Sequence, residues 1–113
     1  MTIPLFKEPL VRIVYPSESE LELTQRAPER LELSCEISQA DAQVRWYCDG
    51  LEVEESPLLV LEVQGAHRKL VIPRTSVDHT GEYVCDTEDD SVTFLVTITG
   101  IYSTLSCKYF IYK

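Results

Sequence analysis

The spacing of two cysteines around one tryptophan constrains this chain more than any other feature. Trp46 follows Cys35 by eleven residues, and Cys85 follows Cys35 by fifty. Tyr83 stands two positions before the second cysteine. In two-sheet β-sandwiches a tryptophan with this spacing packs against the cysteine pair, and a tyrosine at this position bonds to the backbone just upstream. We therefore predict that Cys35, Trp46, Tyr83 and Cys85 meet in the core of a sandwich.

Asp78 and Gly81 extend the pattern to Asp78-x-x-Gly81-x-Tyr83-x-Cys85. These matches are in register, and each sets a position inside the same core, so chance is a poor explanation. The whole pattern is typical of the immunoglobulin sandwich. The predicted fold class is all-β, an immunoglobulin-like Greek-key sandwich of two antiparallel sheets.

Hydrophobic alternation gives independent support for strands. Apolar and polar residues alternate along short segments bounded by turn residues, as in half-buried strands. An opening strand is predicted near residues 10–14, and Leu21 and Leu23 indicate a short second piece. About seven to nine such segments match a sandwich and not a helical bundle. The inner faces of the two clearest segments carry Leu31, Leu33, Cys35 and Ile37, and Val92, Phe94, Val96 and Ile98.

A length of 113 residues fits one domain. We expect residues 9–99 to form it and residues 1–8 to be a linker remnant. Residues 100–113 (GIYSTLSCKYFIYK) form an atypical C-terminal tail, surplus to a domain whose last strand ends near Thr99. One interpretation is an alternative or truncated chain end that extends the last strand or pairs with a sheet edge. A dedicated interaction tail is the second interpretation.

Charge and missing signals indicate which partners and which compartment to expect. Nineteen acidic and ten basic residues give a net charge of −9, which argues against nucleic acid or an anionic membrane as a partner. The sequence has no basic-then-apolar leader, no run of 18 apolar residues and no asparagine for glycosylation. These features favour a cytoplasmic domain, where Cys35 and Cys85 would stay reduced although close enough to bond.

No pattern for catalysis or metal binding is present in the sequence. His67 and His79 lie in separate turns, without cysteine or carboxylate at ligand spacing. The four glycines are scattered singly, and no motif sets a nucleophile beside a base. Acidic pairs such as Asp89-Asp90 fall in turns and lack the register of a calcium loop. We predict no enzyme activity, no cofactor and no metal.

Three segments resemble one family. Residues 44–56 (VRWYCDGLEVEES) resemble the VRWYKDGLEVEES stretch of immunoglobulin domains in obscurin and obscurin-like proteins. Residues 35–38 (CEIS) are similar to the CELS turn of that group, and residues 78–86 (DHTGEYVCD) to its DxGEYVCD motif. The resemblance covers about residues 8–99 and favours the obscurin-like branch. Cys48 stands where the family usually has lysine.

The resemblance implies an intermediate-set (I-set) domain of a large modular protein that is cytoplasmic and associated with the cytoskeleton. Relatives in this family link titin and myomesin at the muscle M-band, so the implied partners are protein domains of titin or myomesin type. The implied function is a non-catalytic interaction and structural module that binds immunoglobulin or fibronectin domains.

Edge strands are the predicted means of binding, because their unpaired N–H and C=O groups can accept a partner's strand. We place the contact on the last strand, through outward-facing Thr93, Leu95 and Thr97, where Leu95 is an apolar residue on a solvent face. Leu95 has a second interpretation, in which it only packs under a neighbouring strand. Two other functions stay open: an extracellular adhesion or receptor domain, and a passive tension-bearing spacer.

Overall fold

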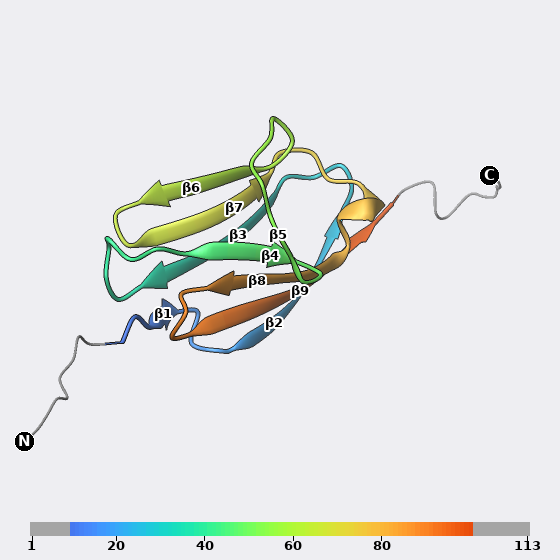
Figure 1. The fold of residues 1–113 in the computed structure, drawn as a ribbon. Coiled ribbons are helices and arrows are strands. Elements are labelled where there is room, and N and C mark those ends of the chain that lie inside the picture. The colour runs from blue at the N-terminus through green and yellow to red at the C-terminus, as the bar shows by residue number, and fades with distance from the viewer. Residues whose placement is uncertain (1–9, 101–113) are drawn as a thin grey trace, which may run out of the picture.

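The computed structural model describes residues 10–100, which form two β-sheets packed face to face (Figure 1). The strands are β1 (Ile13–Tyr15), β2 (Glu20–Arg26), β3 (Leu31–Ile37), β4 (Arg45–Cys48), β5 (Leu51–Glu52), β6 (Val60–Gln64), β7 (His67–Ile72), β8 (Gly81–Asp86) and β9 (Ser91–Thr99). One short 3-10 helix, η2 (Val77–His79), precedes β8. The predicted linker 1–8 and the tail from residue 101 onward lie outside the described residues.

The strand order is β1-β3-β7-β6 in the four-stranded sheet and β2-β9-β8-β4-β5 in the five-stranded sheet. The predicted sandwich is confirmed, with one difference: β2 runs parallel to β9, so the five-stranded sheet is mixed. The difference arises because the N-terminal segment changes sheet. β1 pairs with β3, and after residues 16–19 the chain continues as β2 beside β9.

The core lies between the sheets and follows the predicted alternation. Trp46 and Phe94 stack with ring centroids 6.2 Å apart, across β4 and β9. Burying these side chains, at roughly 25 cal/mol per Å² of apolar surface, is the main stabilising contribution to the fold. The buried core residues are Leu31, Leu33, Cys35, Ile37, Trp46, Leu70, Val71, Ile72, Tyr83, Cys85, Val92, Phe94, Val96 and Ile98.

The last strand, β9, is an interior strand, and its prediction as a binding edge was wrong. β2 pairs with it on one side and β8 on the other. All backbone groups of an interior strand face a neighbouring strand, so β9 has no free edge for a partner. Thr93, Leu95 and Thr97 point outward from the face of the sheet, where Leu95 is half-buried.

Candidate functional site

Cys35 on β3 and Cys85 on β8 meet across the two sheets. Their Sγ atoms are 2.9 Å apart, and both residues are free thiols with at most 1% exposure. The hydrogen bond with Cys35, together with burial, raises the pKa of the Cys85 thiol. Cys85 therefore stays protonated at neutral pH. Because the pair is inaccessible and Cys85 is protonated, the arrangement is suited to packing or cross-linking and not to nucleophilic catalysis.

Tyr83 stabilises the turn between η2 and β8. Its hydroxyl donates a hydrogen bond of 2.6 Å to the carbonyl oxygen of His79, four residues upstream. The imidazole of His79 accepts at Nδ1 from the backbone N–H of Ser76, at 2.9 Å, which caps η2. Burial is the main cause that raises the pKa of the Tyr83 phenol. His79 thus has a structural role in the turn.

Asp78 and Gly81 take different places around this corner. Asp78 is exposed in η2, and its backbone N–H donates to Ser76 Oγ at 3.3 Å. Gly81 begins β8 directly beside the carboxylate of Asp49, in the turn between β4 and β5. That carboxylate accepts a hydrogen bond from the backbone N–H of Glu82 at 2.9 Å. Asp78 and Gly81 therefore both have structural roles in the loops around β8.

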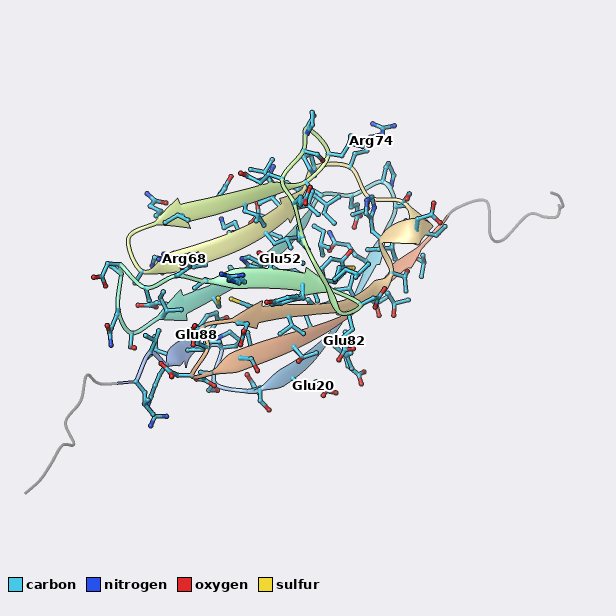
Figure 2. All side chains as sticks on the ribbon, viewed as in Figure 1. Glu20, Glu52, Arg68, Arg74, Glu82 and Glu88 are labelled. Carbon is cyan, nitrogen blue, oxygen red and sulfur yellow. The ribbon has the colours of Figure 1, made fainter. Side chains whose placement is uncertain are left out.

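Arg68 is a buried charged residue that sequence reasoning missed. Only 5% of it is exposed, and its guanidinium donates to four backbone carbonyl oxygens (Figure 2). Two belong to the loop between β3 and β4, Ala40 at 2.8 Å and Ala42 at 3.0 Å. The other two are Gly65 at 2.7 Å and His67 at 3.1 Å. These bonds tie the 40–42 loop to the β6–β7 hairpin.

The outer edge of β2 is the longest free sheet edge in residues 10–100. Toward β9, the carbonyl of Ser19 accepts from the N–H of Thr93 at 2.9 Å, and the N–H of Ala27 donates to the carbonyl of Thr99 at 2.7 Å. Alternate residues of a strand direct their backbone groups to opposite sides. The even-numbered residues between them therefore direct backbone groups to the free edge. These groups are the N–H and C=O of Glu20, Glu22 and Thr24 and the N–H of Arg26, whose carbonyl oxygen already accepts from the N–H of Glu29 at 2.9 Å.

The remaining edges of the described sheets are shorter or capped. β1 has three residues and β5 has two. At the β6 edge, the backbone N–H of Leu61 already donates to Glu55 Oε2 at 2.9 Å. A partner strand would have to displace this carboxylate, whereas no side chain of residues 10–100 caps a backbone N–H at the free edge of β2.

The described residues contain neither a metal-binding cluster nor a membrane-spanning helix. Within residues 10–100, no three histidine, cysteine or acidic side chains are grouped so that they could hold a metal ion. No helix in the same range is long and apolar enough to cross a membrane.

Comparison with known proteins identifies the family. A family model described as the immunoglobulin I-set domain matches residues 20–99. The chain belongs to the immunoglobulin I-set domain family. This agrees with the sandwich, the thiol pair beside Trp46 and the tyrosine corner at Tyr83 described above. I-set domains are typically structural and interaction modules without enzymatic activity.

Two solved immunoglobulin-like domains of human obscurin-like protein 1 are similar to this I-set domain. One is 45% identical, with a TM-score of 0.73, and the match covers 78% of this chain and 97% of that one. The other is 38% identical, with a TM-score of 0.77, and covers 83% and 89% respectively. Human cardiac-type myosin-binding protein C is 34% identical over 79 residues.

The match to human myosin-binding protein C covers 68% of this chain but 6% of that protein. The I-set domain thus spans a small fraction of the curated relatives it matches. Its relatives are proteins of the sarcomere and the cytoskeleton.

Proposed function

We propose that this I-set domain belongs to an obscurin-like cytoskeletal protein and acts as a non-catalytic binding module, by adding a partner's strand to the free edge of β2. The identities of 45% and 38% to domains of obscurin-like protein 1 support the family branch. The proposed partners are immunoglobulin or fibronectin domains of titin or myomesin type. The proposed location is the cytoplasm, in association with the cytoskeleton.

The observation that carries this proposal is the uncapped edge of β2. Seven residues without proline or bulge form the strand, and Glu20, Glu22 and Thr24, with the N–H of Arg26, turn their backbone groups outward. An extended partner segment can hydrogen-bond to these groups and continue the sheet, which is a common mode of recognition.

The side chains of β2 favour particular charges on a partner strand. Glu20 and Glu22 are exposed along the edge. Two identical edges in a parallel arrangement would bring these carboxylates close together, and like charges opposite each other on neighbouring strands are destabilising. In an antiparallel arrangement of two copies, Glu20 would lie opposite Arg26. Opposite-charge pairs are stabilising, so a partner strand with basic residues at these positions is the better fit.

Precedent for a contact of this class comes from a solved complex of titin M10 with an immunoglobulin domain of obscurin-like 1. A chain of that complex has the same fold as this I-set domain, with a TM-score of 0.66 and 20% identity, over 71% of this chain and 86% of that one. The complex is a property of those proteins, and we extend only the class of partner to this chain.

Blocking a single backbone donor tests the β2 edge. Thr24→Pro removes an N–H that faces the free edge, and proline is tolerated on edge strands. Thr24→Val keeps the N–H and is the matched control. Binding to isolated titin and myomesin immunoglobulin domains is measured by surface plasmon resonance. We expect Thr24→Pro to weaken binding at least tenfold and Thr24→Val to leave it unchanged; equal affinity of the two folded variants would exclude this edge.

A passive tension-bearing spacer is a second candidate function, supported by the direction of the chain. The described residues enter the sandwich at the β1 end and leave it at the opposite end, after β9 (Figure 1). A pull on the two ends therefore loads the parallel β2–β9 pair along its length. Absence of binding to every titin and myomesin domain, combined with high unfolding force in single-molecule stretching, would favour the spacer over the binding module.

A further inference from the structure

The outer face of the five-stranded sheet presents uncharged side chains between carboxylates. One row of outward-facing residues crosses all five strands by register, in the order Glu20, Thr93, Val84, Tyr47 and Glu52. Carboxylates stand at both ends of the row, and its middle is made of threonine, valine and tyrosine side chains. Figure 2 labels the glutamates at the two ends, on β2 and β5.

A second row repeats this pattern around Leu95. Glu22 of β2 lies opposite Leu95 on one side, and Glu82 of β8 lies opposite it on the other. Neighbouring strands are about 4.8 Å apart, so the Cα atoms of the two glutamates are separated by about 10 Å. An outward apolar side chain thus lies between two carboxylates in the middle of the sheet.

The carboxylates of this face on β2 and β8 have no basic partner in residues 10–100. Glu20, Glu22 and Glu82 form no ion pair with another described residue. Arg45, a basic side chain of the same face, instead lies 3.7 Å from Glu52. The negative charges of Glu20, Glu22 and Glu82 are therefore not neutralised within the described residues.

The outer face of the four-stranded sheet has a different arrangement of charge. Its carboxylate Glu32 lies 2.6 Å from Arg30 Nε and 3.5 Å from Lys69 Nζ. These ion pairs lower the pKa of Glu32, with the hydrogen bond from Arg30 as the largest cause. The carboxylate of Glu32 is thus neutralised by two bases, whereas Glu22 and Glu82 beside Leu95 form no ion pair with a described residue.

We propose that the outer face of the five-stranded sheet docks a protein segment that carries an apolar side chain between two basic side chains. The two bases pair with Glu22 and Glu82, and the apolar side chain covers Leu95 and Val84. Opposite charges on the two partners steer such an encounter and fix its register. A second copy of this chain does not fit, because two acidic faces repel.

This docking face shares Glu22 with the free edge of β2, but its other residues lie on different strands. Leu95 and Val84 lie on β9 and β8, strands that are paired on both sides. A strand added to the β2 edge would lie beside the sheet and would not cover these residues. Thr24 at the edge, and Glu82 and Leu95 on the face, can therefore be substituted separately, and one site can be excluded without the other.

A short peptide with the proposed chemistry tests the face directly. The probe is acetyl-Lys-Thr-Leu-Thr-Lys-amide, titrated into the ¹⁵N-labelled domain and followed by NMR. Two matched peptides replace either both lysines by glutamate or the leucine by serine. We expect shift changes confined to the amides around Val84, Thr93 and Leu95, and at least tenfold weaker binding by either matched peptide.

Variants of the domain complete the test. Glu82→Lys and Leu95→Ser should each weaken binding of the probe at least tenfold. Glu54→Lys is the charge-matched control, because Glu54 is exposed in the loop after β5 and forms no ion pair with a described residue. We expect this control, and Thr24→Pro at the β2 edge, to bind as the unmodified domain does. The ¹⁵N spectrum of each variant reports whether it is folded.

Three outcomes would overturn the docking face. They are the absence of shift changes at millimolar peptide, shift changes spread over the whole acidic surface, and an equal loss of binding in Glu82→Lys and Glu54→Lys. The last two would mean that the peptide responds only to net charge. A loss of partner binding in Thr24→Pro, with peptide binding retained, would separate the β2 edge from this face.

Discussion

The carboxylate of Asp49 occupies the space that a side chain on Gly81 would need. A Cβ on Gly81 would lie 2.9 Å from Asp49 Oδ2. Asp49 also exchanges hydrogen bonds with Glu82, accepting at Oδ1 from its N–H at 2.9 Å and donating its own N–H to the carbonyl oxygen at 2.8 Å. The turn between β4 and β5 is thereby fixed to the first residues of β8.

Gly81→Ala is expected to lower the free energy of unfolding by about 1–3 kcal/mol, because the added methyl group displaces the Asp49 carboxylate. Asp49→Ala removes the opposing group, so the double variant should lose less stability than the sum of the two single variants. Urea denaturation of all four proteins measures this coupling. Strict additivity would contradict the contact.

Tyr83→Phe is expected to cost about 1 kcal/mol of unfolding free energy, because it removes the hydroxyl that bonds to the carbonyl of His79. Tyr47→Phe is the matched control: Tyr47 is half-buried on the outer face, and its hydroxyl has no hydrogen bond to another described residue. We expect that control to change stability by less than about 0.5 kcal/mol. Similar losses in both variants, in thermal or urea unfolding, would argue against a specific role for the corner.

Arg68→Met is expected to lower the free energy of unfolding by about 2–4 kcal/mol, because four carbonyl oxygens lose a charged donor inside the protein. The matched control is Arg74→Met, at an exposed arginine (Figure 2). Chemical denaturation should show little change for this control. In hydrogen exchange, the 40–42 loop should open in Arg68→Met only, and an unchanged loop would refute its attachment through Arg68.

Thiol counting separates the cytoplasmic interpretation from the extracellular one. The chain has four cysteines, and protein purified under native redox conditions and then unfolded should titrate as four free thiols. Two or fewer would support the extracellular alternative. Oxidation should join Cys35 to Cys85, since their sulfurs are 2.9 Å apart, and should stabilise the fold by about 2–4 kcal/mol.

Removing one negative charge from the outer face of the five-stranded sheet is expected to stabilise the domain slightly. Glu82→Gln removes one of several like charges that have no basic partner in the described chain, and should raise the unfolding free energy by a few tenths of a kcal/mol at low salt, roughly. The gain should disappear in 1 M salt, where the Debye length is about 3 Å. A loss of stability at low salt would show that Glu82 has a stabilising partner.

Glu32→Gln is the corresponding substitution on the four-stranded sheet, and it should lower the free energy of unfolding. The pKa of Glu32 is lowered in the folded protein, chiefly by the hydrogen bond from Arg30. Its contribution is therefore present at neutral pH and is lost as the pH falls through the lowered pKa. The difference between Glu32→Gln and the unmodified domain should vanish in strong acid, and a constant difference across pH would refute this assignment.

The core could be predicted from the sequence because burial follows alternation along each strand. Leu31, Leu33 and Phe94 are buried as the pattern requires. Val63 is an exception: it continues the apolar alternation of β6 but is 69% exposed. It lies near the end of an edge strand, where the opposite sheet no longer covers the side chain.

The neighbours of each strand could not be predicted in the same way. Alternation at Leu21 and Leu23 indicates which side of the chain faces the core, but it carries no information on which strand lies alongside. The sequence therefore predicts β2 only as a short segment, although β2 pairs with the edge of β9 that was predicted to be free. Arg68 was missed because its partners are backbone carbonyls, two of them in a loop 26 and 28 residues away, which leave no residue signature.

Hydrogen exchange at the β2 edge tests the central claim most directly. The measurement compares the Thr24 amide in the free domain with the same amide in complex with a titin or myomesin immunoglobulin domain. Strand addition predicts fast exchange in the free domain and strong protection in the complex, with the same change at Glu22 and Arg26. A stable complex in which these three amides exchange as fast as in the free domain would contradict binding through β2.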